Sequence, residues 1–584
     1  MAPDFTEYEK KRAASVQAIL NSTALKRAII AGPGTGKTFT FRLALEAVTG
    51  KGLVLTFIRI LVNDLEANLG SLAYVNTFHG YCRRLLHTHA TEGIDNNFCY
   101  YPRLPEILAQ DLVIVFGRQC DKDAINEAFQ TLETGSGIIR AALIASDYYN
   151  AVSPDDSVYR VLRHFSTNED DIPEYPLVIV DEYQDFNPLE VRFLELLSKK
   201  SPVLLAGDDD QALYGFKNAS AEYLRGLMQR PDFEKFPLPF CSRCTEVVVN
   251  AADQFVGKAQ DNGLLLNRIS KPFECYLPDK YEDSNKYPRI LHGDCSVQNV
   301  KTSPYMSKYI AWKIQNIPAE EIEESREHGY PTVLIAGPRY ITRPIYKFLM
   351  SYFTDITFVE KPDDSVRLSD AYIKLMVDEK SRVGWRIALY CDPIDNISVV
   401  LRKAIIEKEE LSELLSEDYR EIHLANVRIL KRIKGGEEIS GQEKTQITQA
   451  IGLDFDSIEE LLGVEYNEET LFDEPEAIQV ESTGPRVIMT TFLGMKGLDA
   501  SHVFLIGVNE GDLPKDNRSP TDEEASNFLV GITRARKCCY IVTSGRRGGA
   551  IQTRSIFFDW IEPFTESERI DKNNIAQIDE SLNS

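Results

Sequence analysis

The sequence predicts an α/β protein with two cores, each built on a parallel β-sheet and each interrupted by a mainly helical insertion. Short apolar runs of strand length alternate with helical stretches in two separate parts of the chain, which is typical of parallel strands joined by crossover helices. Within each part the strand signals stop for a long stretch and helical periodicity takes over. The length of 584 residues exceeds what one compact core accommodates, so several lobes are expected.

The first core begins with helical sequence over residues 1–24, and its strands are short apolar runs. A glycine-rich loop follows the first run, and helical sequence resumes at about Thr38 and again over residues 58–70. From about residue 82 to residue 172 the pattern is mainly helical, which we interpret as an insertion into this core. The expected strands of the first core are 28–30, 52–57, 73–75, 177–180 and 202–206.

The second core repeats this organisation nearer the C-terminus. Its insertion is helical and acidic, with Gly435 and Gly436 as a break, and the polar residues after Phe564 are expected to be disordered. The expected strands are 289–291, 332–336, 487–489, 503–506 and 539–542. The predicted division is 1–81 and 173–280 for the first core, 82–172 for its insertion, 281–393 and 481–564 for the second core, 394–480 for its insertion, and 565–584 for the tail.

Bulk composition limits the classes of partner. The formal net charge of −24 argues against a general polyanion binder, because phosphate contacts need Lys and Arg, but it does not exclude a local basic or aromatic groove. No apolar run approaches the roughly 20 residues that cross a bilayer, and the N-terminus is polar rather than a signal peptide. The 10 cysteines form no regular framework, which indicates reduced thiols. We therefore expect a cytoplasmic protein with no membrane partner.

A phosphate-binding loop is predicted after the first strand. Glycines at this point let backbone N–H groups surround phosphate oxygens, and the following helix adds the positive end of its dipole. Lys37 would reach the β- and γ-phosphates of a nucleoside triphosphate, and Thr38 would hold Mg²⁺ through its hydroxyl. The alternative is a tight glycine turn without a catalytic role. The loop comprises Ala31, Gly32, Pro33, Gly34, Thr35, Gly36, Lys37 and Thr38.

An acidic pair follows a second buried strand of the same core. Residues 178–180 lead directly into Asp181 and Glu182. An aspartate at the carboxyl end of a parallel strand suits a Mg²⁺-holding carboxylate, and the neighbouring glutamate suits a general base for the attacking water. The alternative interpretation is an acidic helix start. The acidic pair belongs to the same core as the phosphate loop, which favours the catalytic interpretation.

Several short motifs in a fixed order then resemble those of one helicase group. Residues 181–185 (DEYQD) and 207–216 (GDDDQALYGF) closely resemble motifs II and III of the UvrD/Rep/PcrA group of superfamily 1 helicases. The resemblance continues with motif Ia at 55–57, Ib at 77–79, V at 490–499 and VI at 530–536. It covers nearly the whole chain, and it implies two RecA-like P-loop NTPase cores that bind ATP between them.

The resemblance implies roles for three residues outside the loop. Gln211 would sense the γ-phosphate and couple it to the DNA groove. Arg534, from the second core, would act as an arginine finger with Arg243 as its motif IV partner. Such a finger contributes about 10³- to 10⁵-fold in rate, so closure of the cores would control hydrolysis.

Base and ribose contacts are also implied by the resemblance. Gln17, placed as a Q-motif glutamine, would read the adenine, and Asp499 would bind the ribose. Ser242 stands where the group usually carries an aromatic residue against the base, and Phe39 would stack on the base instead. Alternatively, Gln17 is a glutamine on a helix surface.

Single-stranded DNA is the implied track. Aromatic rings at motif positions would stack on bases without sequence preference, at about 1 to 3 kcal/mol per base. The alternatives are core packing for the aromatic residues and a structural role for the histidine. The implied DNA contacts are Thr56, Phe57, Thr77, His79, Tyr214, Phe216, Lys217 and Thr491.

Two pairs of residues are of types that can bind metal ions. Cys241 and Cys244 have ligand spacing but no matching second pair, so no zinc site is predicted there. His87 and His89 alternate along a basic helix without a carboxylate cluster nearby in the sequence, so none is predicted there either.

The leading functional hypothesis is an ATP-dependent 3′-to-5′ DNA helicase or translocase that acts on single-stranded DNA, alone or as the 3′ overhang of a duplex. The short second insertion favours translocation over unaided unwinding. A second hypothesis is a DNA-stimulated regulatory ATPase subunit that works with a separate nuclease or other protein partner in DNA repair or antiviral defence. A catalytically dead scaffold is the third, although Lys37, Glu182 and Arg534 are all present.

Overall fold

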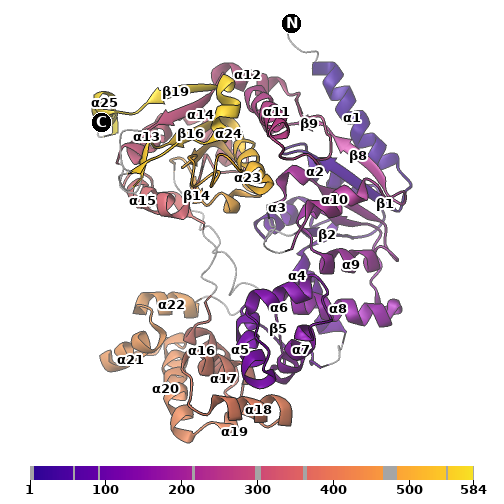
Figure 1. Ribbon diagram of the computed structural model, residues 1–584, viewed down its shortest axis with the longest axis vertical. Helices are drawn as coiled ribbons and strands as arrows, with labels where there is room; N and C mark the ends of the chain where they lie inside the picture. The colour runs from indigo at the N-terminus through magenta and orange to yellow at the C-terminus, as the bar shows by residue number, and fades with distance from the viewer. Residues whose placement is uncertain are drawn as a thin grey trace.

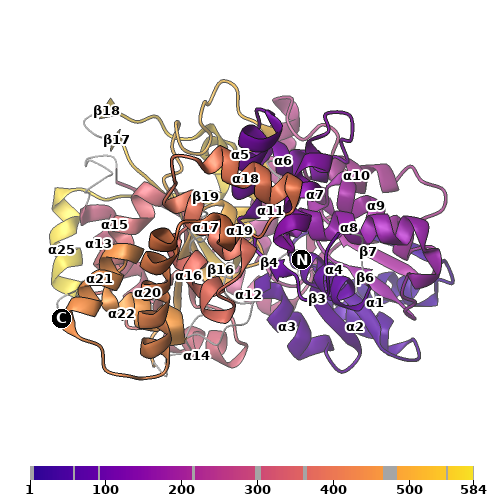
Figure 2. The same ribbon diagram turned by 90° about the horizontal axis from the view of Figure 1, so that it is seen from below.

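The computed structural model shows two α/β cores that lie beside each other and a helical body below them (Figure 1). A view turned by 90° shows the first core and the second core on opposite sides of the molecule, with helices of the two insertions between the viewer and the cores (Figure 2). Among the described residues, no helix combines the length and the apolar character that crossing a bilayer requires. The structure describes residues 5–56, 59–89, 93–213, 218–295, 304–359, 365–463, 483–547 and 550–582.

The first core contains a parallel sheet of six strands in the order β3-β2-β6-β7-β1-β8. The five predicted strands of this core are confirmed. Strands β2, β6 and β7 are buried along their whole length because helices cover both faces of the sheet. The strands are β1 (Lys26–Ala31), β2 (Gly52–Thr56), β3 (Ala73–Thr77), β6 (Val178–Val180), β7 (Val203–Gly207) and β8 (Glu234–Leu238).

The strand order places the predicted functional loops together. Strands β6, β7 and β1 are neighbours, and all run in the same direction. Their carboxyl ends therefore meet at one edge of the sheet. Lys37 opens the helix after β1, Asp181 follows β6, and Asp208 follows β7 at that edge.

The second core contains a parallel sheet of seven strands in the order β13-β14-β12-β15-β16-β11-β19. Its five predicted strands are confirmed, and β13 and β19 were not predicted. The strands are β11 (Ile290–Asp294), β12 (Val333–Ala336), β13 (Ile356–Phe358), β14 (Val487–Thr490), β15 (Ala500–Ile506), β16 (Ala535–Thr543) and β19 (Thr565–Arg569).

The prediction of a disordered tail is wrong for residues 565–582. Strand β19 pairs with β11 along five residues, and helix α25 (Lys572–Leu582) packs against α13 (Pro304–Gln315). Ile575, Ile578 and Leu582 are buried on one face of α25. Apolar residues at helical spacing stabilise this segment despite its acidic composition.

Two boundaries differ from the predicted division. Helices α16 (Leu368–Val377) and α17 (Arg382–Cys391) fall in the range expected for the second core, but they pack against helices of the insertions. Helix α11 (Glu246–Asp261) falls in the range expected for the first core, but it packs against α23 (Asp522–Ile532) and α24 (Ile556–Ile561) of the second. In each case the helix packs against elements other than the sheet that is nearest to it in the sequence.

The two insertions form one helical body. The first runs from α4 (Phe78–Thr88) to α8 (Pro154–Thr167), and the second ends with α22 (Phe455–Gly463). Helix α18 (Ile397–Glu407) of the second packs against α5 (Leu104–Phe116) of the first. Apolar residues of both insertions and of one face of the first sheet belong to a single buried cluster, so the second insertion is anchored to the first core's side of the molecule.

Candidate nucleotide site between the two cores

The predicted phosphate loop connects β1 to helix α2 (Lys37–Glu46). Gly34 and Gly36 adopt left-handed conformations with φ of 66° and 84°, which favour glycine. Ser242 directly follows the short strand β9 (Phe240–Cys241). It holds the loop, because its backbone N–H and its hydroxyl both donate to the Gly34 carbonyl, at 2.8 and 2.9 Å. No side chain caps the first turn of α2, so its N–H groups face the loop without a side-chain acceptor. This geometry is suited to an anion.

Lys37 and the acidic pair are in direct contact. The Lys37 Nζ lies 2.7 Å from Glu182 Oε1 and 3.2 Å from Asp181 Oδ1. Burial opposes the charged ammonium, but the two carboxylates raise the pKa of Lys37 above its ordinary value. Burial likewise opposes an ionised Glu182, but Lys37 and Lys496 hold the pKa of its carboxyl far below the usual range. Glu182 is therefore an ionised carboxylate at the sheet edge.

A chain of hydrogen bonds runs from this carboxylate to the second core. The Gln184 amide donates to Glu182 Oε2 at 2.5 Å and accepts from the Asp208 backbone N–H at 3.1 Å. The Gln211 amide donates to Asp208 Oδ2 at 2.6 Å. Arg534 Nη2 then donates to Gln211 Oε1 at 2.7 Å across the seam between the cores. Hydrogen bonds through side chains and one backbone N–H thus connect the acidic pair beside the phosphate loop to the other core.

Two predicted arginines lie at this seam. Arg243 contacts the phosphate loop so closely that a Cβ at Gly34 would collide with the Arg243 Cβ, and its Nε lies 2.6 Å from Asp499 Oδ2. Burial, together with the positive charge of Arg243, lowers the pKa of Arg534 to about 10, which leaves the guanidinium charged. Asp499 also accepts from Arg536, at 3.0 Å. The structure therefore brings Arg243, Arg534 and Asp499 together beside the loop.

Lys496 completes the seam, although it was not among the predicted site residues. Its side chain is 2% exposed, and its Nζ lies 2.5 Å from Asp185 Oδ2 and 2.6 Å from the Gln211 carbonyl. It stands 3.9 Å from Glu182 Oε2. A lone lysine in the largely apolar run 492–500 was the available signal, since a buried ammonium requires partners.

Lys271 holds the acidic run that precedes Gln211. Its Nζ lies within 2.8 Å of Asp208 Oδ1, Asp209 Oδ1 and Asp210 Oδ2, and its side chain is 5% exposed. An ammonium group therefore occupies the centre of this three-carboxylate cluster, where a cation would otherwise bind. Arg268 adds a second charged contact to Asp210, at 2.7 Å. Three consecutive carboxylates after a buried strand require such partners, but the sequence did not show which residues supply them.

Of the two residues predicted to contact the adenine base, Phe39 lies beside the phosphate loop and Gln17 does not. Gln17 is exposed and donates to Asn21 along its own helix at 2.8 Å, so the structure does not bring it to the loop. Arg12 of the same helix α1 (Phe5–Asn21) reaches Gly36 instead. The Arg12 guanidinium lies 5.0 Å from the centre of the Phe39 ring and 5.4 Å from that of Tyr276. Phe39 is 47% exposed beside the loop, as stacking on a base requires.

The expected DNA contacts are only partly described. Thr56 and Thr77 are register partners at the carboxyl ends of β2 and β3, and the Thr77 hydroxyl caps α4 by accepting from Gly80 N–H at 3.1 Å. The Thr491 hydroxyl accepts from Gly494 N–H at 3.2 Å. The Nε2 atom of His79 lies 3.6 Å from one oxygen each of Asp155 and Glu190. Phe57, Tyr214, Phe216 and Lys217 lie outside the described residues.

Comparison with known proteins gives matches in both halves of the chain. A family profile described as an AAA domain matches residues 12–217, and one described as the UvrD-like helicase C-terminal domain matches residues 373–546. The chain is 23% identical to the ATP-dependent DNA helicase UvrD1 of Mycobacterium tuberculosis, over 88% of this chain and 79% of that protein. It is 22% identical to the ATP-dependent DNA helicase PcrA of Bacillus subtilis, over 89% of this chain and 81% of that protein.

Proposed function

Because the chain belongs to the UvrD-like superfamily 1 helicases, an ATP-dependent DNA helicase family, we propose that it moves 3′ to 5′ along single-stranded DNA and hydrolyses ATP at the seam between its cores. The observation that supports this most is the continuous hydrogen-bond chain from Glu182 to Arg534. A charge donated from the second core to a nucleotide on the first makes hydrolysis depend on closure. Repeated closure and opening is what stepping along a strand requires.

Each residue at the loop has a chemical task in this proposal. Lys37 and the loop N–H groups bind the phosphates, and Arg243 and Arg534 stabilise the charge that develops on the transferred phosphoryl group. Thr38 and Asp181 offer a hydroxyl and a carboxylate, the hard oxygen ligands that Mg²⁺ prefers, so they would hold that ion. When bound, Mg²⁺ neutralises phosphate charge.

The Lys37–Glu182 contact suggests how substrate prepares the base. The Lys37 ammonium lies 2.7 Å from the Glu182 carboxylate, and this contact makes the carboxylate a weak proton acceptor. Phosphate oxygens attract the same ammonium and would free one carboxylate oxygen, while Gln184 keeps hold of the other. The freed oxygen can then take a proton from water. Glu182 itself has a left-handed backbone with φ of 54°, a conformation that usually occurs at functional sites when a non-glycine residue adopts it.

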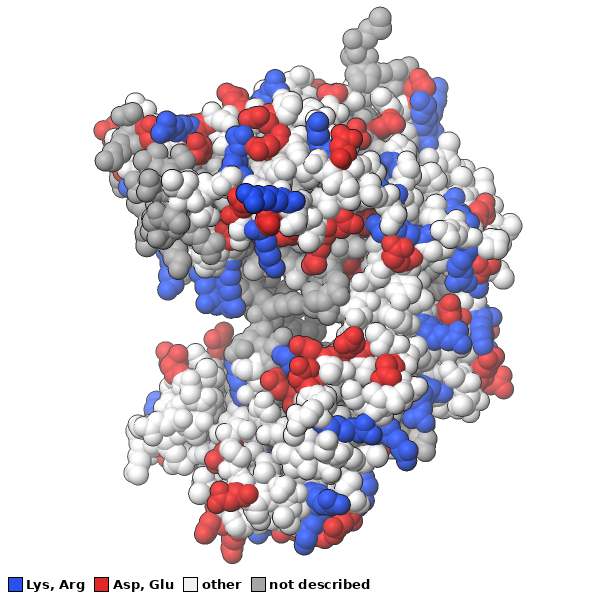
Figure 3. Space-filling view, in the orientation of Figure 1, with Lys and Arg blue, Asp and Glu red and all other residues white. Residues whose placement is uncertain are grey.

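The DNA path is proposed to run over both sheets. Thr77 ends β3 of the first sheet and Thr491 follows β14 of the second, and both are partly exposed, so each core presents a hydroxyl group at a carboxyl edge. Thr56, the register partner of Thr77, is fully buried and does not present its hydroxyl. Figure 3 shows a hollow between the second core and the helical body, with Lys and Arg on the side of the core and a group of Asp and Glu on the opposite side. A chain with a net charge of −24 needs such local basic surface to hold a polyanion.

Two measurements on the purified chain test this function. ATP turnover with Mg²⁺ should rise on addition of oligo-dT, and the protein should displace streptavidin from a 5′-biotinylated strand faster than from a 3′-biotinylated one. A rate of ATP turnover that does not rise when DNA is added would contradict the proposal of a DNA motor. Turnover that rises with DNA without displacement from either end would favour the alternative, a DNA-stimulated regulatory ATPase subunit that works with a separate nuclease.

A further inference from the structure

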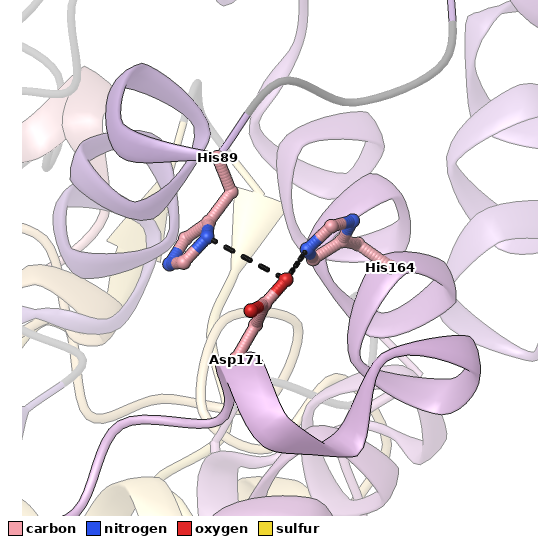
Figure 4. Close-up of side chains that lie close together, drawn as sticks. All are labelled: His89, His164 and Asp171. Carbon is pink, nitrogen blue, oxygen red and sulfur yellow. Dashed lines mark hydrogen bonds and ion pairs between the residues drawn. The ribbon is translucent and has the colours of Figure 1, made fainter.

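A cluster of two histidines and one aspartate lies in the first insertion, away from the phosphate loop. His89 caps the C-terminal end of α4, His164 lies in the last turn of α8, and Asp171 ends a short 3-10 helix, η1 (Glu169–Asp171). Figure 4 shows both imidazole rings directed at the Asp171 carboxylate from opposite sides. No metal site was predicted at His89, because no carboxylate cluster lies near it in the sequence; the fold brings the Asp171 carboxylate to it.

The three ligand atoms lie close enough together to reach one ion, although His164 Nε2 and Asp171 Oδ2 are now joined by a direct hydrogen bond. His164 Nε2 lies 2.7 Å and His89 Nδ1 lies 3.9 Å from the same oxygen, Asp171 Oδ2. Two ligands of a tetrahedral zinc ion, each about 2.0 to 2.1 Å from the metal, lie about 3.3 Å apart. One distance is shorter and the other longer than this value by about 0.6 Å. One ligand atom from each residue lies within 4.8 Å of the others, so side-chain movement alone can form the site.

The surroundings leave the ligands accessible but oriented. The side chains of His89, His164 and Asp171 are 27%, 17% and 44% exposed, so an ion can enter from solvent. Phe165 contacts both imidazole rings with ring centres 5.9 Å away and restricts their rotation. The Asn168 side-chain amide lies 3.4 Å from His164 Nδ1, the ring nitrogen opposite the one that would bind the metal. The same Asn168 nitrogen donates to the His164 carbonyl at 3.1 Å and to Thr167 Oγ1 at 3.0 Å, so Asn168 is held against the end of α8 beside His164.

His87, two residues before His89, provides a comparison. Its Nδ1 lies 2.9 Å from the Asn96 carbonyl, and its ring stacks on Phe98 at 4.3 Å. It therefore has a structural role and is not part of the cluster. The two histidines of one short segment thus have separate environments, which makes His87 a matched control.

We propose that His89, His164 and Asp171 bind one zinc ion, or a divalent transition metal of the same ligand preference, which joins the ends of α4 and α8 to the segment that leads back into β6. Two imidazoles and one carboxylate are ligands that zinc accepts in proteins, and solvent can complete the coordination. Helix α4 leaves the first core after β3, and the chain returns to β6 shortly after Asp171. The ion would therefore stabilise the point at which the insertion leaves and rejoins the core.

Zinc binding to the full chain tests this site. After treatment with EDTA and dialysis, the chain is titrated with ZnCl₂ by calorimetry, and the visible spectrum is recorded with Co²⁺ as a substitute. The wild-type chain and His87→Ala should each bind one equivalent of zinc. His164→Ala should bind that equivalent at least about tenfold more weakly than the wild type. Asp181→Asn should retain this equivalent, which separates it from the Mg²⁺ ligands of the nucleotide site.

A conservative variant guards against misfolding. Asp171→Asn keeps a hydrogen-bonding group beside His164 but removes the carboxylate, so it should fold as the wild type does and lose the equivalent. Zinc should raise the melting temperature of the wild type and of His87→Ala, and leave that of Asp171→Asn unchanged. Equal zinc affinity in the wild type, His164→Ala and Asp171→Asn would overturn the proposal, as would a wild-type chain that binds no zinc.

Discussion

Arg534 is held by both cores, although it belongs by sequence to the second. Its Nε donates to the Val530 carbonyl at 3.1 Å within the second core, and its Nη2 donates to Gln211 of the first at 2.7 Å. Arg534 is 3% exposed, so its guanidinium lies where water is largely excluded. The electrostatic interactions of a charge are strong in such a place. A side chain so placed is sensitive to how closely the cores approach.

Arg534→Ala is expected to lower DNA-stimulated ATP turnover by about 10³- to 10⁵-fold, since the loss of a charge aimed at the transferred phosphoryl group has this size. Phosphate release measures turnover, and a fluorescent ATP analogue checks that nucleotide still binds. Arg518→Ala, which alters an exposed arginine of the same core, is the control and should turn over normally. A loss of less than tenfold in Arg534→Ala would contradict the role proposed for this residue.

His292 predicts a dependence of stability on pH that is separate from catalysis. It lies in β11 with Nδ1 2.8 Å from Ser567 Oγ and Nε2 2.7 Å from Thr543 Oγ1, and burial lowers its pKa to about 4. An unfolded histidine titrates near pH 6.5, so as the pH falls below that value the unfolded chain binds the proton first. Stability is therefore complete above about pH 6.5 and falls as the pH approaches 4.

The expected loss from His292 is about 2.5 kcal/mol between about pH 7 and pH 4.5. Urea denaturation at the two pH values measures it, with a signal from the second core. His292→Gln should lose less stability on acidification than the wild type by this amount, because glutamine does not titrate. His328→Gln, at an exposed position, should behave as the wild type. Identical acid sensitivity in His292→Gln and the wild type would show that this histidine is not the source.

At the scale of elements, sequence reasoning succeeded where burial is complete and failed at the margins. Strand β7 and residues 503–506 of β15 are buried at every position, so they stand out as uninterrupted apolar runs. Edge strand β8 alternates exposed and buried residues and contains Lys235 and Pro237, so its pattern is weak. Edge strand β19 is mostly polar, which also explains why the tail was predicted to be disordered. These strands exist because a neighbouring strand offers them hydrogen bonds.

The candidate site divides in the same way. Lys37, Asp181 and Glu182 could be predicted because each stands next to a strand whose direction is readable. Lys271 and Lys496 were not predicted. Lys496 stands out only as a lone lysine in a largely apolar run, and the partners of both lysines are carboxylates that only the fold brings within reach. Gln17 was predicted at the site but does not lie there. Its spacing from the loop fits a Q-motif glutamine, but helix α1 directs a different residue, Arg12, toward Gly36.

At the scale of the whole molecule, the two insertions are joined by a buried ion pair. Arg386 of α17 lies 2.8 Å from Asp111 of α5, and both side chains are fully buried. Tyr149 donates to the second oxygen of Asp111 at 2.9 Å, and Arg386 also donates to Gln110 at 2.5 Å. Burial raises the pKa of the Asp111 carboxyl, and Arg386 opposes that rise. The pair links a segment of the second insertion to the first core's side, so movement of the second core cannot carry its insertion along freely.

Removal of one partner of this pair should be far more costly than removal of both. Asp111→Ala leaves a buried, unpaired guanidinium and is expected to lower the free energy of unfolding by about 3 to 5 kcal/mol. The double variant Asp111→Leu with Arg386→Met replaces both charges by apolar groups of similar volume, and it should recover most of that loss. Urea denaturation of the wild type, Asp111→Leu, Arg386→Met and the double variant measures the coupling, and Asp111→Ala is measured beside them. If Asp111→Ala costs less than about 1 kcal/mol, solvent reaches Arg386 in solution, and the two insertions separate readily enough for the second to move with its own core.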